Sequence, residues 1–333
     1  MANKQYISII RLLKYCEIPT DVAFDLPRTK KQLQAEFNIA QGGFIETDGY
    51  TYTRQDVFEE IDRPDFLSRL HFHKQLWNSP QILQMLEKNK ADLELLSGEF
   101  KPFWSNPQFD EFFSPYFAAP FNYISRTLLA DMQFEMMGEL LAFDGFLLPS
   151  EREEAFSPLR TFLDDSVKLL RNISKDNYKM MRPKMAHWID TDWHGFLNAL
   201  PDELYDVKVQ IVNRLINIGV AVQKTHRRDC RKMSGQLILL SDMPENLRSV
   251  IFSNHKIYSR SRFSLQLRSG FWAVWLIIAI VRAISSESCN NSSNGLNGFD
   301  QTKFTIDSSV LKALRDSSKY FQKSDTAHLP RYP

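Results

Sequence analysis

The 333-residue sequence is poor in cysteine and in glycine. Its three cysteines, Cys16, Cys230 and Cys289, are far apart, and no CxxC pair occurs. A disulfide framework and a thiolate zinc site are therefore not expected, and this cysteine usage is typical of a protein in a reducing compartment. The 12 glycines form no GxGxxG, GxxxxGK[ST] or GxSxG motif, which argues against a phosphate-binding loop and against a serine hydrolase.

An excess of charge of one sign is also missing. The chain has 41 Lys and Arg against 40 Asp and Glu, a formal net charge of +1. No bulk field then attracts nucleic acid, which is not an expected partner. A secretory leader needs roughly 7 to 15 uninterrupted apolar residues, but Arg11 and Lys14 interrupt the apolar residues near the N-terminus, so none is expected.

The sequence is rich in aromatic residues and in helical apolar spacing. It contains 25 Phe, 11 Tyr and 6 Trp, an aromatic content that argues against disorder. Apolar residues three and four apart predict a mainly α-helical fold. The predicted helices cover residues 5–16, 29–38, 122–143, 151–172, 184–200 and, as the longest and most central, 202 to about 231.

One short segment predicts a β-hairpin. Asp48-Gly49 separates two β-prone runs, Phe44 to Thr47 and Tyr50 to Thr53. Asp-Gly favours the positive φ angles of a type I′ turn. Thr53 is then placed to cap the following helix, with Asp56 at its third position.

Residues 100–123 combine ten aromatic residues with four prolines. Proline disfavours one continuous helix through this segment. One interpretation is a lid of aromatic side chains on the helical core, and the other is a surface that receives a protein partner or enters the lipid headgroup layer. The candidates for such a surface are Phe103, Trp104, Phe112, Phe113 and Tyr116.

The run from Gly270 to Val281 raises the question of a membrane. Its 12 apolar residues make about 18 Å of helix, whereas a bilayer core is about 30 Å thick. Arg268 and Arg282 flank the run, and long cationic side chains extend the effective length by reaching the interface. We therefore predict a transmembrane helix over 270–286. Its anchoring residues are Trp272, Trp275, Leu276, Ile277, Ile278, Ile280 and Arg282.

Basic residues precede this run more densely than they follow it. The segment 256–269 contains Lys256, Arg260, Arg262 and Arg268, and by the positive-inside rule the N-terminal part stays cytoplasmic. A further basic stretch, residues 225–232, is expected at the C-terminal end of the longest helix, where cations complement the helix dipole. Two alternatives to the span stay open: a helix buried in a soluble core, and an interfacial or re-entrant segment.

Candidates for chemistry are few. His187, Asp190 and His194 fall on one face if 184–200 is a single helix, which permits a metal site but also fits an ordinary solvated face. His71 and His73 are two residues apart and face different ways on a helix. Asp131, Glu135 and Glu139 are interpreted as an exposed acidic face, with a cation or basic partner as the alternative.

These observations predict four segments. Residues 1–255 form a helical cytoplasmic domain with a hairpin near 44–53, 256–269 a basic juxtamembrane segment, 270–286 a single transmembrane helix, and 287–333 a polar tail with a short helix near 306–322. The expected function is that of a membrane-anchored interaction or scaffold protein with a protein partner and no cofactor. The alternatives are a metal-dependent helical enzyme using His187, Asp190 and His194, and a soluble protein whose residues 270–286 are core.

Overall fold

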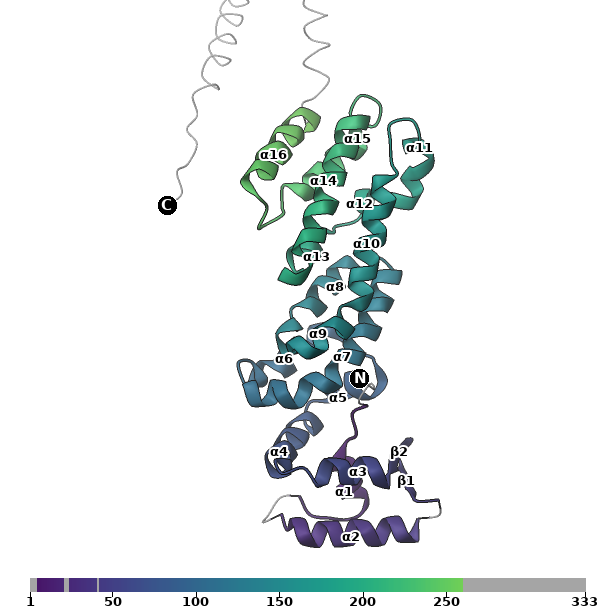
Figure 1. The fold of residues 1–333 in the computed structure, drawn as a ribbon, viewed down its shortest axis with the longest axis vertical. Coiled ribbons are helices and arrows are strands. Elements are labelled where there is room, and N and C mark those ends of the chain that lie inside the picture. Colours follow the sequence, from purple (N-terminus) through teal and green to yellow (C-terminus); the bar gives the residue numbers. More distant parts are fainter. Residues whose placement is uncertain (1–4, 21–23, 41, 260–333) are drawn as a thin grey trace, which may run out of the picture. The chain divides into compact units, whose positions relative to one another are not determined.

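The computed structural model describes residues 5–20, 24–40 and 42–259. The chain divides into two units, Met1–Ser261 and Arg262–Pro333, and all described residues belong to the first. They form helices throughout, with one two-stranded sheet (Figure 1). The prediction of a mainly α-helical fold is thereby confirmed.

The hairpin lies where the turn chemistry places it. Strands β1 (Phe44–Thr47) and β2 (Tyr50–Thr53) pair antiparallel. Asp48 and Gly49 have φ angles of 52° and 80°, as a type I′ turn requires. The Thr53 hydroxyl accepts a hydrogen bond from the Asp56 amide at 3.1 Å and caps the next helix as predicted.

The helices follow one another with short connections. Those around the hairpin are α1 (Ile9–Tyr15), α2 (Leu26–Ile39), α3 (Arg54–Ile61) and α4 (Phe66–Trp77). The central ones are α5 (Pro80–Lys88), α6 (Leu93–Phe100), α7 (Pro107–Ala130), α8 (Phe134–Leu141), α9 (Pro149–Ala155) and α10 (Ser157–Arg171). The last are α11 (Tyr178–Met181), α12 (His187–Asp190), α13 (His194–Asn198), α14 (Tyr205–Val222), α15 (Arg227–Leu237) and α16 (Glu245–Ser259). Short 3-10 turns are η1 (Lys101–Phe103), η2 (Asp144–Phe146), η3 (Arg182–Met185) and η4 (Asp202–Leu204).

Helix α7 continues through two prolines, so the expected break in residues 100–123 is wrong from Pro107 onward. Pro115 and Pro120 lie inside the helix, where a proline costs about 3 kcal/mol. The same helix buries thirteen residues, and each fully buried phenylalanine contributes about 1.5–3 kcal/mol. Tertiary packing thus outweighs the local cost of the prolines.

Several predicted helices are interrupted. The segment 122–143 divides between α7 and α8 at Met132, whose φ is 54°. The segment 151–172 divides between α9 and α10, and 184–200 becomes η3, α12 and α13. The longest predicted helix, 202–231, is η4 and α14 followed by a separate α15. Each prediction joined neighbouring helices because the apolar spacing continues across a short turn.

Two clusters of buried apolar side chains hold the unit together. The first comes from α1, α2, the hairpin, α3 and the start of α4, and the second begins with Tyr6 and Phe72 and extends to α16. Helix α4 supplies both, with Phe66 and Leu70 in the first and Phe72 and Leu76 in the second. The two clusters therefore meet along α4.

Helix α14 occupies the inside of the second cluster, as its apolar spacing predicted. It packs against α10 and α15 and also contacts α16 (Figure 1). Ile211, Leu215, Ile218 and Val222 are all buried, whereas Val220 on the second apolar face is exposed. None of the helices in the described ranges is long and apolar enough to cross a bilayer.

Candidate functional site

The predicted metal-ligand set is not brought together on one helical face. Helix α12 ends at Asp190, the chain is extended at Thr191, and α13 begins at His194. The Asp190 carboxylate contacts Arg182 at 3.2 Å and Lys232 at 2.7 Å, and His194 Nδ1 contacts Gln236 Oε1 at 2.8 Å. Residues 5–20, 24–40 and 42–259 contain no group of three His, Cys, Asp or Glu side chains that could hold a metal ion.

His187 lies apart from the other two. Burial lowers the pKa of His187 to about 4, and its Nε2 has no hydrogen-bond partner among the described residues. Its ring lies about 6.0 Å from those of Phe134 and Phe162. His187 is therefore a neutral residue in an aromatic environment.

Asp190 belongs to an ion network around a buried carboxylate, Asp229. Arg182 donates to both oxygens of Asp229, at 3.0 and 3.2 Å, and the Tyr178 hydroxyl donates to it at 3.0 Å. Burial and the neighbouring Asp229 charge both raise the pKa of Tyr178, which stays protonated as a donor. Through Asp229 the network joins α11 and η3 to α15, and through Asp190 and Lys232 it joins α12 to α15.

The aromatic candidates for a partner surface serve mainly as core. Phe103, Phe112, Phe113 and Tyr116 are buried, and only Trp104, with 56% of its surface accessible, is exposed. Phe103 and Phe109 stack with ring centroids 4.1 Å apart. Four of the five aromatic residues are thus unavailable to a partner in this conformation.

A second buried polar network lies where the two apolar clusters meet. Arg69 of α4 donates from Nε and Nη2 to the two carboxylate oxygens of Glu60 in α3, at 2.5 and 3.1 Å. The Tyr116 hydroxyl of α7 lies 3.1 Å from Glu60 Oε2 and 2.9 Å from Arg69 Nη2. All three side chains are buried, so a fully hydrogen-bonded ion pair connects three helices.

His73 and Tyr6 extend this network in one direction. Tyr6 Oη lies 3.0 Å from His73 Nδ1, and His73 Nε2 lies 3.3 Å from Glu60 Oε1. Burial lowers the pKa of His73 against the opposing effect of Glu60, and burial also raises the pKa of Tyr6. A neutral His73 that accepts from the Tyr6 hydroxyl and donates through Nε2 to Glu60 satisfies both contacts.

Glu60 is ionised within this network. Burial opposes its charge, but the hydrogen bonds from His73 and Arg69 outweigh burial and lower the pKa of Glu60 to about 2. Glu60 is not among the residues predicted from the sequence, because its partners lie 9 to 56 residues further along the chain. The sequence does contain one indication of this site. Glu60 lies on the same buried face of α3 as Val57, and Arg69 lies on the same buried face of α4 as Leu70, so both charged residues occupy apolar positions.

The remaining sequence candidates lie at the surface or outside the described residues. His71 is exposed whereas His73 is buried, as their spacing predicted. Asp131, Glu135 and Glu139 are all exposed, and Asp131 lies beyond the end of α7. The predicted anchor 270–286 and the basic residues Arg260, Arg262 and Arg268 lie outside the described residues.

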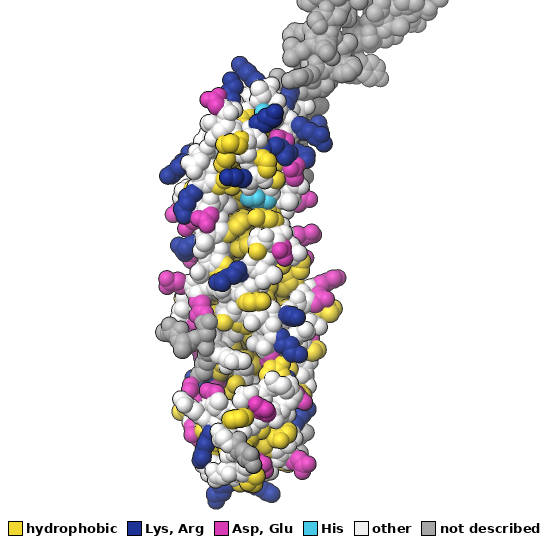
Figure 2. All heavy atoms as spheres, turned by 90° about the vertical axis from the view of Figure 1, so that its right-hand side faces the viewer, with side chains coloured by type: hydrophobic (Ala, Val, Ile, Leu, Met, Phe, Trp, Pro, Cys, Tyr) yellow, Lys and Arg dark blue, Asp and Glu magenta, His cyan; other side chains and the backbone are white. Residues whose placement is uncertain are grey.

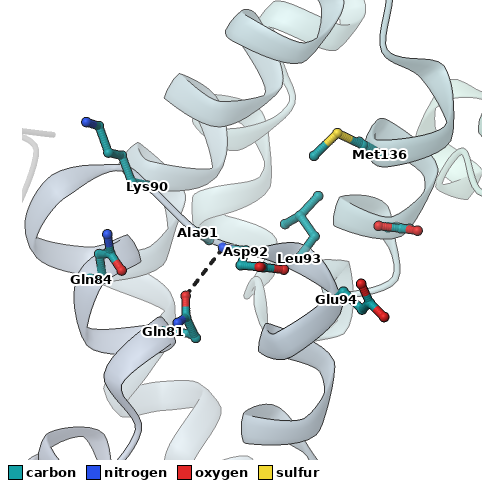
Figure 3. A pocket seen from close by; sticks show the side chains of 9 residues that line it. Gln81, Gln84, Lys90, Ala91, Asp92, Leu93, Glu94 and Met136 are labelled. Carbon is teal, nitrogen blue, oxygen red and sulfur yellow. Dashed lines mark hydrogen bonds between the residues drawn. The ribbon is translucent and has the colours of Figure 1, made fainter.

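An open pocket of about 710 Å³ lies between α5, α6 and α8. Figure 3 shows Gln81 and Gln84 on one side, Asp92 and Glu94 near the start of α6, and Met136 opposite. The Asp92 amide donates to Gln81 Oε1 at 3.4 Å. Glu139 also lines this pocket. Its mixed lining, which includes Lys90, favours no one ligand class.

A cationic groove of about 470 Å³ lies between α15 and α16. Its lining residues are Arg228, Arg231, Lys232, Gly235, Gln236 and His255. Arg228, Arg231 and Lys232 are exposed, and of these only Lys232 has an ion pair within the described part of the chain. In Figure 2, Lys and Arg side chains gather on the upper part of the face shown, where Figure 1 places α11 and α15.

The position of these cations corrects the prediction for residues 225–232. They begin α15 and do not end a long helix, so the negative end of a helix dipole does not explain them. Arg227 instead donates to the Tyr258 and Ile257 carbonyls at the end of α16, at 3.1 and 2.7 Å. Arg227 therefore satisfies carbonyls that a helix C-terminus leaves open.

A comparison of the chain with known protein families, curated proteins and solved structures finds no match.

Proposed function

We propose that this chain is a single-pass membrane protein whose helical part, on the cytoplasmic side, is an interaction module. Residues 270–286 are the transmembrane helix in this proposal, and 287–333 follow on the far side. The observation that carries it is the cationic groove of α15 and α16, because α16 ends at Ser259, inside the basic segment 256–269 that leads to the apolar run.

Charge in this part of the fold suits a surface that faces anionic lipid. Residues 207–259 contain nine Lys and Arg against three Asp and Glu. One of those acids, Asp229, is buried and paired with Arg182. A basic residue near an anionic bilayer contributes about 1 kcal/mol of attraction, so Arg228, Arg231, Lys232 and Lys256 together favour a position against the headgroups.

Exposed apolar residues accompany these cations. Phe252 of α16 is 53% accessible and lies four residues from both Arg248 and Lys256, so the three share one helix face. Leu239 and Ile257 are also exposed. Cationic and apolar side chains together on a helix surface are typical of segments that rest at a membrane interface.

The flanking residues Arg268 and Arg282 favour the span over the buried-helix alternative, because long cationic side chains extend the effective length of the apolar run. One observation supports the buried-helix alternative: α16 has exposed apolar side chains, and a helix packed on them would remove them from water. The experiment below separates the two.

The test is membrane fractionation of the full chain and of an Ile277→Asp, Ile278→Asp double variant. A span predicts that the wild-type chain stays in the membrane pellet in carbonate and is released only by detergent. Two aspartates near the centre of a span cost about 5–7 kcal/mol on the insertion scale, so the variant is expected to be soluble and folded by circular dichroism.

Two results would contradict the proposal. Release of the wild-type chain by carbonate alone excludes an integral span. Loss of helical signal in the double variant, with aggregation of residues 5–259, shows instead that 270–286 belongs to the core. An Ile39→Asp, Leu67→Asp variant is the matched control, because both side chains are exposed and the substitution adds the same charge.

A further inference from the structure

A pocket of about 690 Å³ lies beside the Glu60 network. It is formed by the segment before α1, by β2, by α3 and by α7. Its lining contains four tyrosines, Tyr6, Tyr50, Tyr52 and Tyr116. This volume is within the range of about 300–1,000 Å³ that is usual for ligand sites.

The described residues that line the pocket carry charges of one sign, which is negative. Asp56, Glu59 and Glu60 line the pocket, and no lysine or arginine of the described residues does. Arg69 lies behind the lining and compensates Glu60. Arg11 lies 4.0 Å from the centroid of the Tyr50 ring and is paired with Glu87 at 2.5 Å. Carboxylates and aromatic faces both attract cations.

The hydroxyl of Ser8 is a second, independent observation at this pocket. Ser8 lines the pocket, is 2% accessible, and its Oγ has no hydrogen-bond partner within the described part of the chain. It precedes α1, where a serine hydroxyl usually caps the helix, but no capping bond forms. A buried hydroxyl without a partner is unfavourable, and a donor in the pocket removes that cost.

We infer that this tyrosine- and carboxylate-lined pocket binds a primary alkylammonium group, the group carried by a lysine side chain or a free polyamine. Its aliphatic part lies against the tyrosines, and its nitrogen donates to Ser8 Oγ and to the two exposed carboxylates of the lining, Asp56 and Glu59. The inference does not depend on the membrane anchor, because no residue of the pocket comes from beyond Tyr116.

Two other ligand classes fit the same residues less well. A quaternary ammonium group also binds tyrosine faces, but it has no N–H to donate to Ser8 Oγ, whereas a primary ammonium has three donors. An anion meets the exposed carboxylates of Asp56 and Glu59 and no cationic side chain among the described residues of the lining. The sign of the charge therefore selects a cation, and among cations the acceptor lone pairs of Ser8 Oγ favour a primary ammonium.

The test is isothermal titration calorimetry of the full-length protein in nonionic detergent micelles, with n-butylammonium chloride as the probe. We expect a Kd on the order of 1 mM. The neutral n-butanol has the same chain without the charge and is expected to bind at least about tenfold more weakly. Choline, which lacks N–H donors, is expected between the two.

Two variants test the residues, each with a matched control. Ser8→Ala removes the unpartnered hydroxyl and is expected to weaken butylammonium binding about tenfold. Ser125→Ala removes another buried hydroxyl without a partner, outside the pocket, and leaves binding unchanged. Glu59→Gln is expected to weaken binding about threefold or more, whereas the exposed Glu153→Gln has no effect.

The same titrations identify the source of the amine. Tighter binding of a blocked Gly-Lys-Gly peptide than of butylammonium indicates a protein lysine, and tighter binding of spermidine indicates a free polyamine. Equal affinity for butylammonium and n-butanol, or an unchanged affinity in both Ser8→Ala and Glu59→Gln, overturns the inference. Glu59 is exposed, so its variant keeps the test decisive even where Ser8→Ala does not fold.

Discussion

Two buried carboxylates of this protein have the same kinds of partner in different surroundings. Glu60 and Asp229 each accept two hydrogen bonds from one arginine, and each lies within hydrogen-bond distance of one tyrosine hydroxyl. The side chain of Arg69, which holds Glu60, is 7% accessible, whereas that of Arg182, which holds Asp229, is 36% accessible. One ion pair is therefore sealed, and the other is open to solvent and to further ions.

The difference follows the distribution of charge along the chain. Residues 44–154 contain 20 Asp and Glu against nine Lys and Arg, and residues 207–259 contain three against nine. The network around Glu60 adjoins an acidic pocket, and that around Asp229 adjoins the cationic groove of α15 and α16. A chain with a net charge of +1 thus has two regions of opposite sign, and we propose an amine as the ligand of one and lipid headgroups as the partner of the other.

The comparison is tested most strongly by Glu60→Gln. This change leaves the Arg69 guanidinium buried without a counter-charge, which typically costs about 3–5 kcal/mol. Chemical denaturation of the detergent-solubilised chain, followed by circular dichroism, measures the loss. Glu59→Gln is the neighbouring control and is expected to change stability by about 0.5 kcal/mol or less. A loss below about 1 kcal/mol for Glu60→Gln argues against a sealed ion pair.

Asp229→Asn is expected to have a smaller effect, about 1–2 kcal/mol, in the same measurement. Arg182 is partly solvated and keeps Asp190 as a partner at 3.2 Å, so the variant leaves no isolated buried charge. The informative result is which of the two variants, Glu60→Gln or Asp229→Asn, loses more free energy of unfolding. If Asp229→Asn destabilises the chain as much as Glu60→Gln does, the two networks are equivalent and the distinction between them fails.

The smallest expected effect concerns the pH dependence of stability that comes from two histidines, the buried His73 and the partly buried His187. His73 has hydrogen bonds on both ring nitrogens, whereas His187 Nε2 has no partner among the described residues. The pKa of His187 falls from its ordinary value of 6.5 to about 4. The unfolded chain therefore binds a proton at His187 as the pH falls below about 6.5, and the folded chain does not, so stability is lost between pH 6.5 and 4.

His187→Phe removes this loss and suits the surrounding aromatic rings. At pH 5 the variant is expected to be about 1 kcal/mol more stable than the wild-type chain, allowing for the partial exposure of His187. At pH 7.5 the gain is smaller, since wild-type His187 is then neutral in both states. Denaturation curves at the two pH values measure the difference, and an identical change at both contradicts the assignment.

Acid also acts on Glu60, in a separate window. Its folded pKa of about 2 lies below its ordinary value of 4.5, so the stabilisation is present above about pH 4.5 and is lost as the pH falls toward 2. This window lies mostly below that of His187, and the two contributions are separable by pH alone.

Local chemistry made part of the fold predictable. Asp48-Gly49 specifies its turn through positive φ angles, and Thr53 caps α3 through one nearby amide, so neither depends on distant residues. The apolar spacing of α14 likewise predicted a helix inside the core. Helix ends were less predictable: the turn at Met132 has no glycine or proline, and packing keeps α7 helical through Pro115 and Pro120.

The candidate sites depend on contacts that spacing does not encode. Tyr116 meets Glu60 across 56 residues, and Tyr178 meets Asp229 across 51. The predicted metal ligands show the reverse case. His187, Asp190 and His194 are close in sequence, but the chain leaves the helix at Thr191, so the three side chains do not share one helix face. Charged residues on buried helix faces, such as Glu60 and Arg69, are the signal that sequence reasoning can use.

The account is tested most directly by protease protection of the full chain in sealed membrane vesicles that expose their cytoplasmic face. An epitope placed after Pro333 reports the tail, and an antibody against the helical part reports residues 5–259. We predict that protease removes the helical part while the epitope survives until detergent is added. Digestion of both in intact vesicles, or protection of the helical part instead of the epitope, contradicts a span at residues 270–286 with the cationic helices on the cytoplasmic side.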